Sequence, residues 1–185
     1  MTKKKLQILD CTIRDGGYLN NWQFDQTFVR ELYRAHSKSG IDFMEIGFRS
    51  SEVYFDPEKF GPWKFTPEDL VNRVSEGISG PKISMMVDFG KIDLDDICLK
   101  NESRISLYRV TAHKNKVFQA IEMCEAIYQK GYIASIQLMG IVNYTDDDFT
   151  PIVEALEKSN IEYVYFADSY GSLLPSDMER IISKL

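Results

Sequence analysis

Short apolar runs alternate with amphipathic stretches along the whole chain. Six runs are each five to eight residues long and rich in β-branched or aromatic residues, as buried strands require: Leu6–Ile13, Phe43–Phe48, Lys82–Val87, Ile105–Val110, Tyr132–Met139 and Tyr163–Ala167. No linker rich in Gly, Ser or Pro divides them. The pattern predicts one domain over residues 1–185, with a parallel sheet and helices between the strands.

The stretches between the runs show helical periodicity. Apolar residues at i, i+4 and i+7 form one face at Phe28, Leu32 and Ala35. A longer apolar face over residues 117–128 predicts a helix that Gly131 closes. Thr145 and Asp148 have the spacing of a capping box, and Ser176 after Pro175 is expected to open the last helix.

Six strand–helix units leave two architectures open. The strand starts lie about 31 residues apart on average, and eight such units would need roughly 250 residues, the usual size of a (β/α)8 barrel. The chain is therefore either a complete doubly wound sheet or six units of a TIM-type barrel with two missing.

The polar residues at the strand ends favour the barrel. All carboxyl ends of barrel strands face one mouth, whereas a doubly wound sheet uses only some of them. Here every strand ends in residues able to do chemistry: Asp10, Thr12, Arg14 and Asp15; Glu45 and Arg49; Asp88; Arg109, Thr111 and His113; Gln137 and Asn143; Asp168 and Ser169. Glycine patterns of nucleotide-binding loops do not occur.

The densest polar segment is Asp10–Tyr18, after the first predicted strand. Gly16 and Gly17 would allow close backbone approach or a turn with positive φ. The carboxylate of Asp15 could hold a hard divalent cation while the guanidinium of Arg14 stabilises an oxyanion. A surface ion pair beside a Gly-Gly turn is the alternative from spacing alone.

Composition removes several classes of function. Lys plus Arg is 22 and Asp plus Glu is 28, for a net charge of −6, so nucleic acid and anionic membranes are poor partners. No apolar window is long enough for a transmembrane helix, and the basic start lacks the apolar segment of a secretory signal. We expect a cytoplasmic protein. Its three cysteines, Cys11, Cys98 and Cys124, are expected to be reduced.

The segments DCTIRDGGYLNNW, MEIGF and ADSYGSLLP resemble the HMG-CoA lyase-like, or DRE-TIM metallolyase, superfamily. This group includes 4-hydroxy-2-oxovalerate aldolases, HMG-CoA lyases, isopropylmalate synthases and pyruvate carboxyltransferase domains. The resemblance covers nearly the whole chain, in register with all six predicted strands. It implies a TIM-type barrel, truncated here to about six units.

The resemblance also implies roles for individual residues. Asp15 would bind the catalytic divalent metal, with Mn²⁺ or Mg²⁺ expected and Co²⁺ or Zn²⁺ possible. Arg14 would stabilise the enolate oxygen, and Glu45 would hold Arg14 in place. Ser169 and Asp168 match the family's D-[ST]-x-G, where a hydroxyl can contact a 2-oxo acid carboxylate; an N-cap or loop anchor is the alternative for Asp168. Substrate contacts at the mouth are expected from Asp88, and from the pair Arg109 and Thr111.

Two departures from the family pattern concern the chemistry. Tyr18 stands where the aldolases carry the His that serves as general base, and a phenol could replace it only with a pKa well below about 10. The family's His-x-His metal ligands are absent, since the chain contains only His36 and His113. We expect His36 on a helix surface and His113 near the mouth, as a group for substrate contact or proton transfer.

The sequence therefore predicts the N-terminal part of a metal-dependent carbon–carbon lyase. The preferred activity is an aldolase that releases pyruvate from a 4-hydroxy-2-oxo acid through an enolate. A Claisen-type synthase joining acetyl-CoA to a 2-oxo acid and a non-catalytic barrel domain remain open. Exposed strand edges would favour a homo-oligomer, and the isolated 185 residues are expected to be weakly active or inactive.

Overall fold

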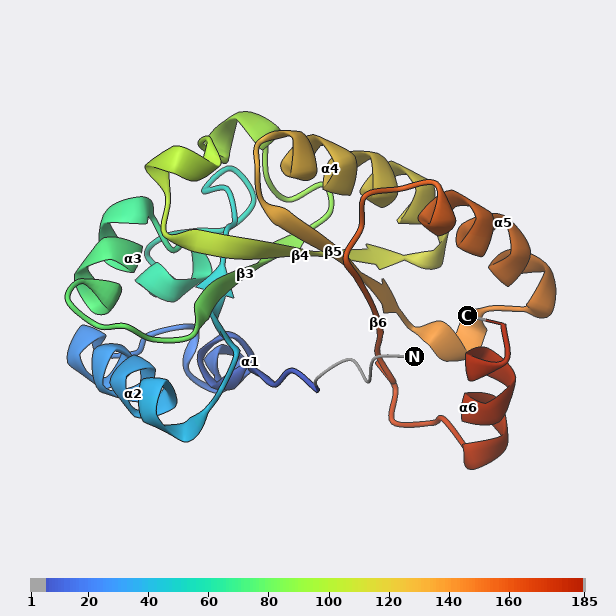
Figure 1. Cartoon of the computed structure of the whole chain (residues 1–185), viewed down its shortest axis with the longest axis horizontal. Helices are drawn as coiled ribbons and strands as arrows, with labels where there is room; N and C mark the ends of the chain where they lie inside the picture. The colour runs from blue at the N-terminus through green and yellow to red at the C-terminus, as the bar shows by residue number, and fades with distance from the viewer. Residues whose placement is uncertain (1–5, 185) are drawn as a thin grey trace.

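Six parallel strands form one curved sheet with its helices on the outer side. The computed structural model describes residues 6–184, and the basic residues at the start of the chain lie outside them. The strands follow in sequence order from β1 to β6, and every neighbouring pair is parallel. Figure 1 shows the strands lining the inside of an open, barrel-like arc. This confirms the truncated TIM-type fold of about six βα units.

The strands lie within the predicted apolar runs or at most two or three residues beyond them. Their bounds are β1 Leu9–Asp10, β2 Phe43–Phe48, β3 Lys82–Asp88, β4 Ile105–His113, β5 Ile133–Met139 and β6 Tyr163–Phe166. β1 is much shorter than its run, because the chain turns into a helix directly after Cys11. The pairing of β2 with β3 shifts register between Glu45 and Phe48, whereas β4 and β5 pair in unbroken register.

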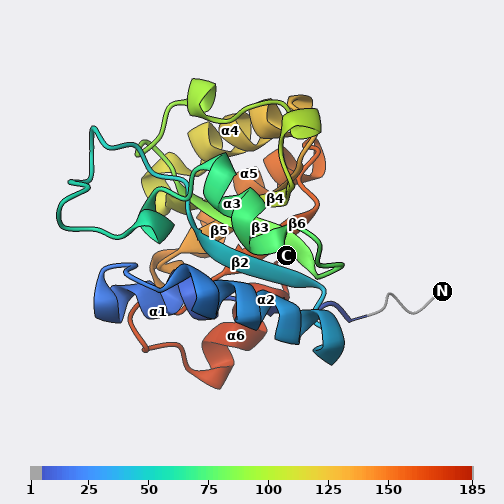
Figure 2. The same ribbon diagram turned by 90° about the vertical axis from the view of Figure 1, so that its left-hand side faces the viewer.

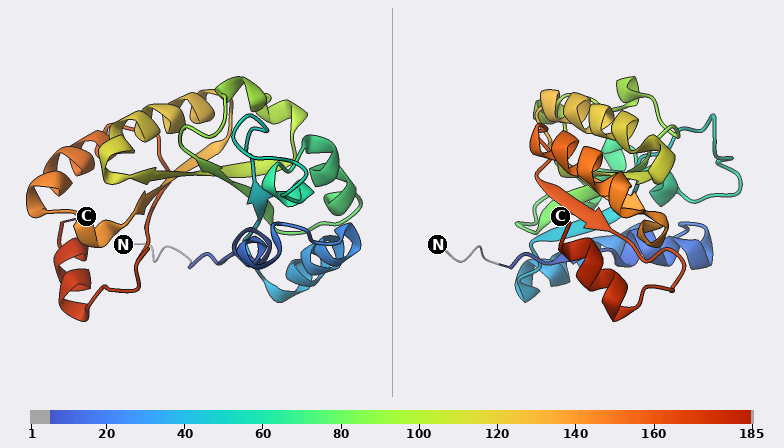
Figure 3. Two further views of the ribbon diagram at one scale, coloured as in Figure 1. Left: turned by 180° about the vertical axis from the view of Figure 1, so that it is seen from behind. Right: turned by 90° about the vertical axis from the view of Figure 1, so that its right-hand side faces the viewer.

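The helices connect successive strands around the outside of the arc. They are α1 Thr12–Asn20, α2 Gln26–Ser39, α3 Glu68–Ser75, α4 Val117–Gln129, α5 Asp146–Glu157 and α6 Pro175–Ile182. Figure 2, seen from the side of α2 and α3, and the two views of Figure 3 show that the outer helices follow the curve of the sheet. No helix in the described part of the chain is long and apolar enough to cross a membrane.

The helix ends carry the predicted signals in two places. Gly131 follows α4 with a φ of +95°, the left-handed conformation that closes a helix. Thr145 and Asp148 form a reciprocal capping box at the start of α5. The last helix differs, because α6 begins at Pro175 and Leu174 occupies the N-cap position that was expected of Ser176.

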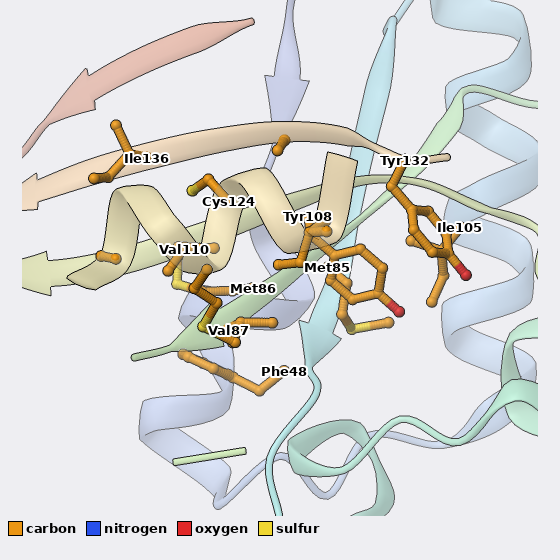
Figure 4. Close-up of a cluster of buried hydrophobic side chains, with 14 of the residues drawn as sticks. Phe48, Met85, Met86, Val87, Ile105, Tyr108, Val110, Cys124, Tyr132 and Ile136 are labelled. Atoms are coloured by element: carbon orange, nitrogen blue, oxygen red, sulfur yellow. The ribbon is translucent and has the colours of Figure 1, made fainter. Parts of the chain in front are cut away.

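The core lies between the sheet and its outer helices. Figure 4 shows the central cluster, in which Tyr108, Tyr132 and Cys124 meet methionine and branched aliphatic side chains. The Tyr108 and Tyr132 rings pack edge to face, with centroids 4.9 Å apart. The three cysteines are free thiols. Close packing on this side leaves the polar strand ends directed toward the inside of the arc.

Candidate active site

The segment that carries Arg14 and Asp15 is helical, and this corrects the expectation of a glycine turn. Gly16 and Gly17 lie inside α1, and neither has a positive φ. Gly17 allows close approach instead, since a Cβ there would lie 2.1 Å from the Trp22 ring. Asn21 and Trp22 adopt the left-handed conformation, with φ of 54° and 57°, so the chain folds back over the helix.

Trp22 anchors this turn to the residue that precedes Asp15. Its indole Nε1 donates a hydrogen bond of 2.9 Å to the backbone oxygen of Arg14. The Trp22 side chain is buried among aromatic neighbours that include Phe48 and Phe60. Aromatic residues of the turn after α1 and of the long loop after β2 therefore pack the site from one side.

Glu45 is the buried centre of a group of charged side chains. It is fully buried on β2, where its Oε2 accepts from Arg14 Nε at 2.8 Å. Its Oε1 lies 3.4 Å from Arg109 Nε and 3.5 Å from the hydroxyl of Ser84. Burial is the largest influence and lowers the pKa of Arg14, but the Glu45 carboxylate and Cys11 together raise it by more, so the net shift is upward and the guanidinium remains charged.

Asp15 occupies the solvent side of Arg14. Its Oδ1 accepts from Arg14 Nη1 at 2.8 Å, and 68% of its side chain is exposed. An exposed carboxylate oxygen suits a hard divalent cation. The part of the chain that the structure describes contains no group of three His, Cys, Asp or Glu able to hold a metal ion. These residues thus fit one ligand of the expected metal, and no complete ligand set.

Arg109 is held in the interior from three sides. Nη2 donates to Gln137 Oε1, and Nη1 lies 3.8 Å from Cys11 Sγ. The guanidinium also covers the Tyr165 ring at 4.6 Å from its centroid. β1, β2, β4, β5 and β6 therefore converge on one polar interior.

Thr111 and His113 follow Arg109 at alternate positions of β4, toward the carboxyl end of the strand. Thr111 Oγ1 donates to Asp88 Oδ1 at 2.8 Å. His113 is exposed and borders a cleft of about 320 Å³ that Tyr18 and Asp88 also line. His113 further borders a second cleft of about 470 Å³ between the loops after β4 and β5. The expected position of His113 near the mouth agrees with this geometry.

Tyr18 has a raised pKa. Burial is the largest cause, followed by the carboxylate of Asp88. The direction is opposite to the one a phenolate base at neutral pH would need. Tyr18 is therefore suited to donate a hydrogen bond or a proton, and it does not replace the expected histidine as a base.

Asp168 and Ser169 are engaged by the loop after β6. Asp168 accepts the backbone N–H groups of Ser172 and Leu173, and these bonds lower the pKa of its carboxyl group. Ser169 Oγ accepts from Gly140 N at 2.9 Å. No hydrogen bond within residues 6–184 joins either side chain to Arg14, Asp15 or Glu45. The contacts of Asp168 correspond to the loop-anchor alternative.

His36 was expected on a helix surface, and the structure corrects this. Its side chain is 13% exposed, and its Nε2 lies 3.1 Å from Asp10 Oδ1. Asp10 also accepts from the backbone and hydroxyl of Thr12. The helix α2 places His36 toward the sheet because β1 lies beside it, and a periodic pattern alone did not indicate that contact.

The chain is similar to known proteins at low sequence identity. No family model matches it. It is 22% identical to the oxaloacetate decarboxylase of Mycobacterium tuberculosis, over 100% of this chain and 54% of that protein. It is 19% identical to the 4-hydroxy-2-oxovalerate aldolase of Moorella thermoacetica, over 97% of this chain and 53% of that protein. The chain spans about half the length of these curated relatives.

Solved structures show the same fold. The N-terminal domain of a candidate aldolase from Bacteroides vulgatus superimposes with a TM-score of 0.81 at 23% identity, over 97% of this chain and 60% of that one. The carboxyl transferase domain of Rhizobium etli pyruvate carboxylase gives a TM-score of 0.72 at 16% identity, over 100% and 34%. The resemblance to the HMG-CoA lyase-like superfamily is confirmed. The superfamily relatives are aldolases and related lyases.

Proposed function

We propose that this chain carries the enolate-stabilising half of a divalent-metal-dependent aldolase that releases pyruvate from a 4-hydroxy-2-oxo acid. The observation that supports it best is the pair of contacts made by Arg14, to buried Glu45 and to exposed Asp15. Glu45 fixes the guanidinium, so that its remaining N–H groups can meet an oxyanion without reorganising. Asp15 stands beside it with an exposed oxygen for a cation.

A bound metal and Arg14 would both act on the 2-oxo carbonyl oxygen of the substrate. A divalent ion on Asp15 and further ligands, which these residues do not supply, would polarise the 2-oxo carbonyl as a Lewis acid. Arg14 would hydrogen-bond the same oxygen as it gains negative charge. Arg109 would bind the substrate carboxylate from the interior, and Thr111 would orient Asp88 at the edge of the cleft. Asp168 and Ser169 would act through the position of the loop after β6.

Decarboxylation of oxaloacetate is a second candidate, favoured by the similarity to the Mycobacterium tuberculosis enzyme. Both reactions break a carbon–carbon bond and leave the enolate of pyruvate. The same Arg14 and Asp15 arrangement therefore serves either one. The substrate group that departs, an aldehyde or carbon dioxide, distinguishes them.

Exchange of the pyruvate methyl protons in D₂O tests the shared step. Proton NMR would follow the methyl signal with Mg²⁺ or Mn²⁺, chelated before detection, for these 185 residues and for the longest natural form of the protein. Metal-dependent exchange that is lost in Arg14→Met supports an enolate site. Subsequent turnover of 4-hydroxy-2-oxovalerate or of oxaloacetate then selects between the two reactions. Absence of exchange with metal bound would favour acyl-CoA condensation or a non-catalytic barrel.

A further inference from the structure

Lys64 carries its amino group inside an aromatic box. It ends the short 3-10 helix η1 (Pro62–Lys64) between β2 and α3, and only 3% of the residue is exposed. Its Nζ lies 3.9 Å from the ring centroid of Phe48, 4.1 Å from that of Phe55 and 4.4 Å from that of Trp22. No carboxylate of residues 6–184 lies within ion-pair distance of it. Lysines are rarely buried without such a partner, which points to a role beyond packing.

The box adjoins the candidate active site. Phe48 pairs in register with Met86 of β3. Ser84, Met86 and Asp88 are two residues apart along β3, so their side chains lie on the same face of the sheet. Ser84 on that face contacts Glu45. Another wall of the box, Trp22, is hydrogen-bonded to the backbone of Arg14. Two walls of the box, Trp22 and Phe48, are therefore joined to residues of the site by backbone hydrogen bonding or strand pairing.

Tyr18 shares two walls of the box with Lys64. Its ring packs edge to face against Trp22 at 4.7 Å and against Phe48 at 6.4 Å. Tyr18 and Asp88 both border the 320 Å³ cleft that reaches His113. The amine, the phenol and the carboxylate thus lie around the same aromatic pair.

The charges around Lys64 determine which group can accept a proton. Burial lowers the pKa of Lys64, and Asp88 on β3 opposes part of that change; α1, β2 and the loop after β2 present the aromatic rings. Burial and Asp88 both raise the pKa of Tyr18. The amine therefore loses its proton more easily than an ordinary lysine, whereas the phenol keeps its own more firmly.

We propose that Lys64 is a proton-transfer residue of this enolate site and takes the part that a histidine plays in similar aldolases. The assignment rests on the proposed function. In cleavage, neutral Nζ accepts the proton of the C4 hydroxyl as the C3–C4 bond breaks. The bonding pair moves into the pyruvate enolate, and the aldehyde departs. The resulting ammonium then returns the proton to C3, so no other reactant is needed.

The test is the pH dependence of pyruvate methyl exchange in the longest natural form of the protein, with Mg²⁺ present. We expect the wild-type rate to rise with pH as Lys64 becomes neutral. Lys64→Met should lower exchange about 100-fold, the lower range of general-base effects. Lys64→Arg should lose as much at neutral pH, because a guanidinium keeps the charge and cannot release the proton. Small primary amines should restore part of the rate to Lys64→Ala.

Lys82→Met is the matched control, because Lys82 Nζ also covers an aromatic ring, that of Phe43 at 5.5 Å, but it is exposed at the start of β3. It should exchange within about twofold of wild type, and urea unfolding would show which variants are folded. A folded Lys64→Met or Lys64→Arg with the wild-type rate and pH profile would overturn this assignment alone. Absence of exchange in the wild-type protein would overturn the proposed function and this assignment with it.

Discussion

Glu45 Oε2 accepts a hydrogen bond of 2.8 Å from Arg14 Nε, although the two residues are 31 positions apart in the sequence. The other carboxylate oxygen, Oε1, lies 3.4 Å from Arg109 Nε. One buried carboxylate therefore lies between two guanidinium groups from different strand–helix units. A salt bridge with exposed partners is weak, but breaking a buried one leaves uncompensated charge. This relationship orients Arg14 and also joins α1, β2 and β4.

Glu45→Gln should lower the free energy of unfolding by about 3 kcal/mol, because buried Arg109 loses its counter-charge and Arg14 keeps only the exposed carboxylate of Asp15. Urea unfolding at neutral pH measures the change. Glu31→Gln is the control, since Glu31 pairs with Arg34 on an exposed surface and its loss should cost less than about 0.5 kcal/mol. Equal effects of the two substitutions would contradict the central role of Glu45.

Gly17→Ala should destabilise the protein by about 1–3 kcal/mol, since the added methyl group would collide with the buried Trp22 ring. Trp22 fluorescence should shift as the indole leaves its place beside Arg14. Gly16→Ala offers a neighbouring comparison, because its Cβ would lie 3.3 Å from the tip of the Phe24 ring. A larger loss of stability for Gly16→Ala than for Gly17→Ala would show that the turn is packed differently.

Asp15→Asn should weaken Mn²⁺ binding at least tenfold in the longest natural form of the protein, because the amide removes the anionic oxygen of a ligand. Isothermal titration calorimetry measures the affinity directly. Asp147→Asn makes the same chemical change at an exposed residue of α5, and should leave the affinity unaltered. Unchanged binding in Asp15→Asn would remove Asp15 from the metal site.

The ionisation of Asp148 should make the stability of the first turn of α5 depend on pH. Hydrogen bonds from Lys114 and Thr145 lower its pKa to about 2, below the value of about 3.9 for an unfolded chain. A lowered pKa means that the stabilisation is complete above about pH 4 and is lost as the pH falls toward 2. NMR titration of the Asp148 carboxyl group would measure this. Titration near pH 4 would show that the capping contacts do not persist in solution.

Self-association is expected from the two edges of the sheet. β1 and β6 each have one strand neighbour in the described sheet, and unpaired strand edges favour pairing with another chain. Light scattering after size exclusion should give a dimer or a larger species for the 185 residues. A monomer that turns over substrate would contradict both this expectation and the expected weak activity.

Most of the fold could be predicted from the sequence because local patterns specify it. β-Branched and aromatic runs such as Ile105–Val110 marked the strands, and Gly131 marked a helix end. The first strand was predicted too long, since the last two residues of the run LQILDCTI, Thr12 and Ile13, already belong to α1. Apolar character alone does not reveal where backbone hydrogen bonding changes from sheet to helix.

The candidate site was predictable only in part. The string around Arg14 and Asp15 identified the chemistry, and the resemblance linked Glu45 to Arg14. Nothing in the local sequence indicated that His36 would lie against Asp10 or that Lys64 would be enclosed by three rings. Both depend on contacts between residues far apart along the chain.

By itself, the sequence determined the order of strands and helices, the polar residues at the strand ends and the superfamily they resemble. Those properties follow from side-chain periodicity and from short strings of residues. The tertiary structure decided which of the polar residues meet, which charges are buried and which proton donors or acceptors change in strength. The physical reason is that desolvation and Coulombic interaction depend on distances in space, and the curvature of the sheet brings Arg14, Glu45 and Arg109 together.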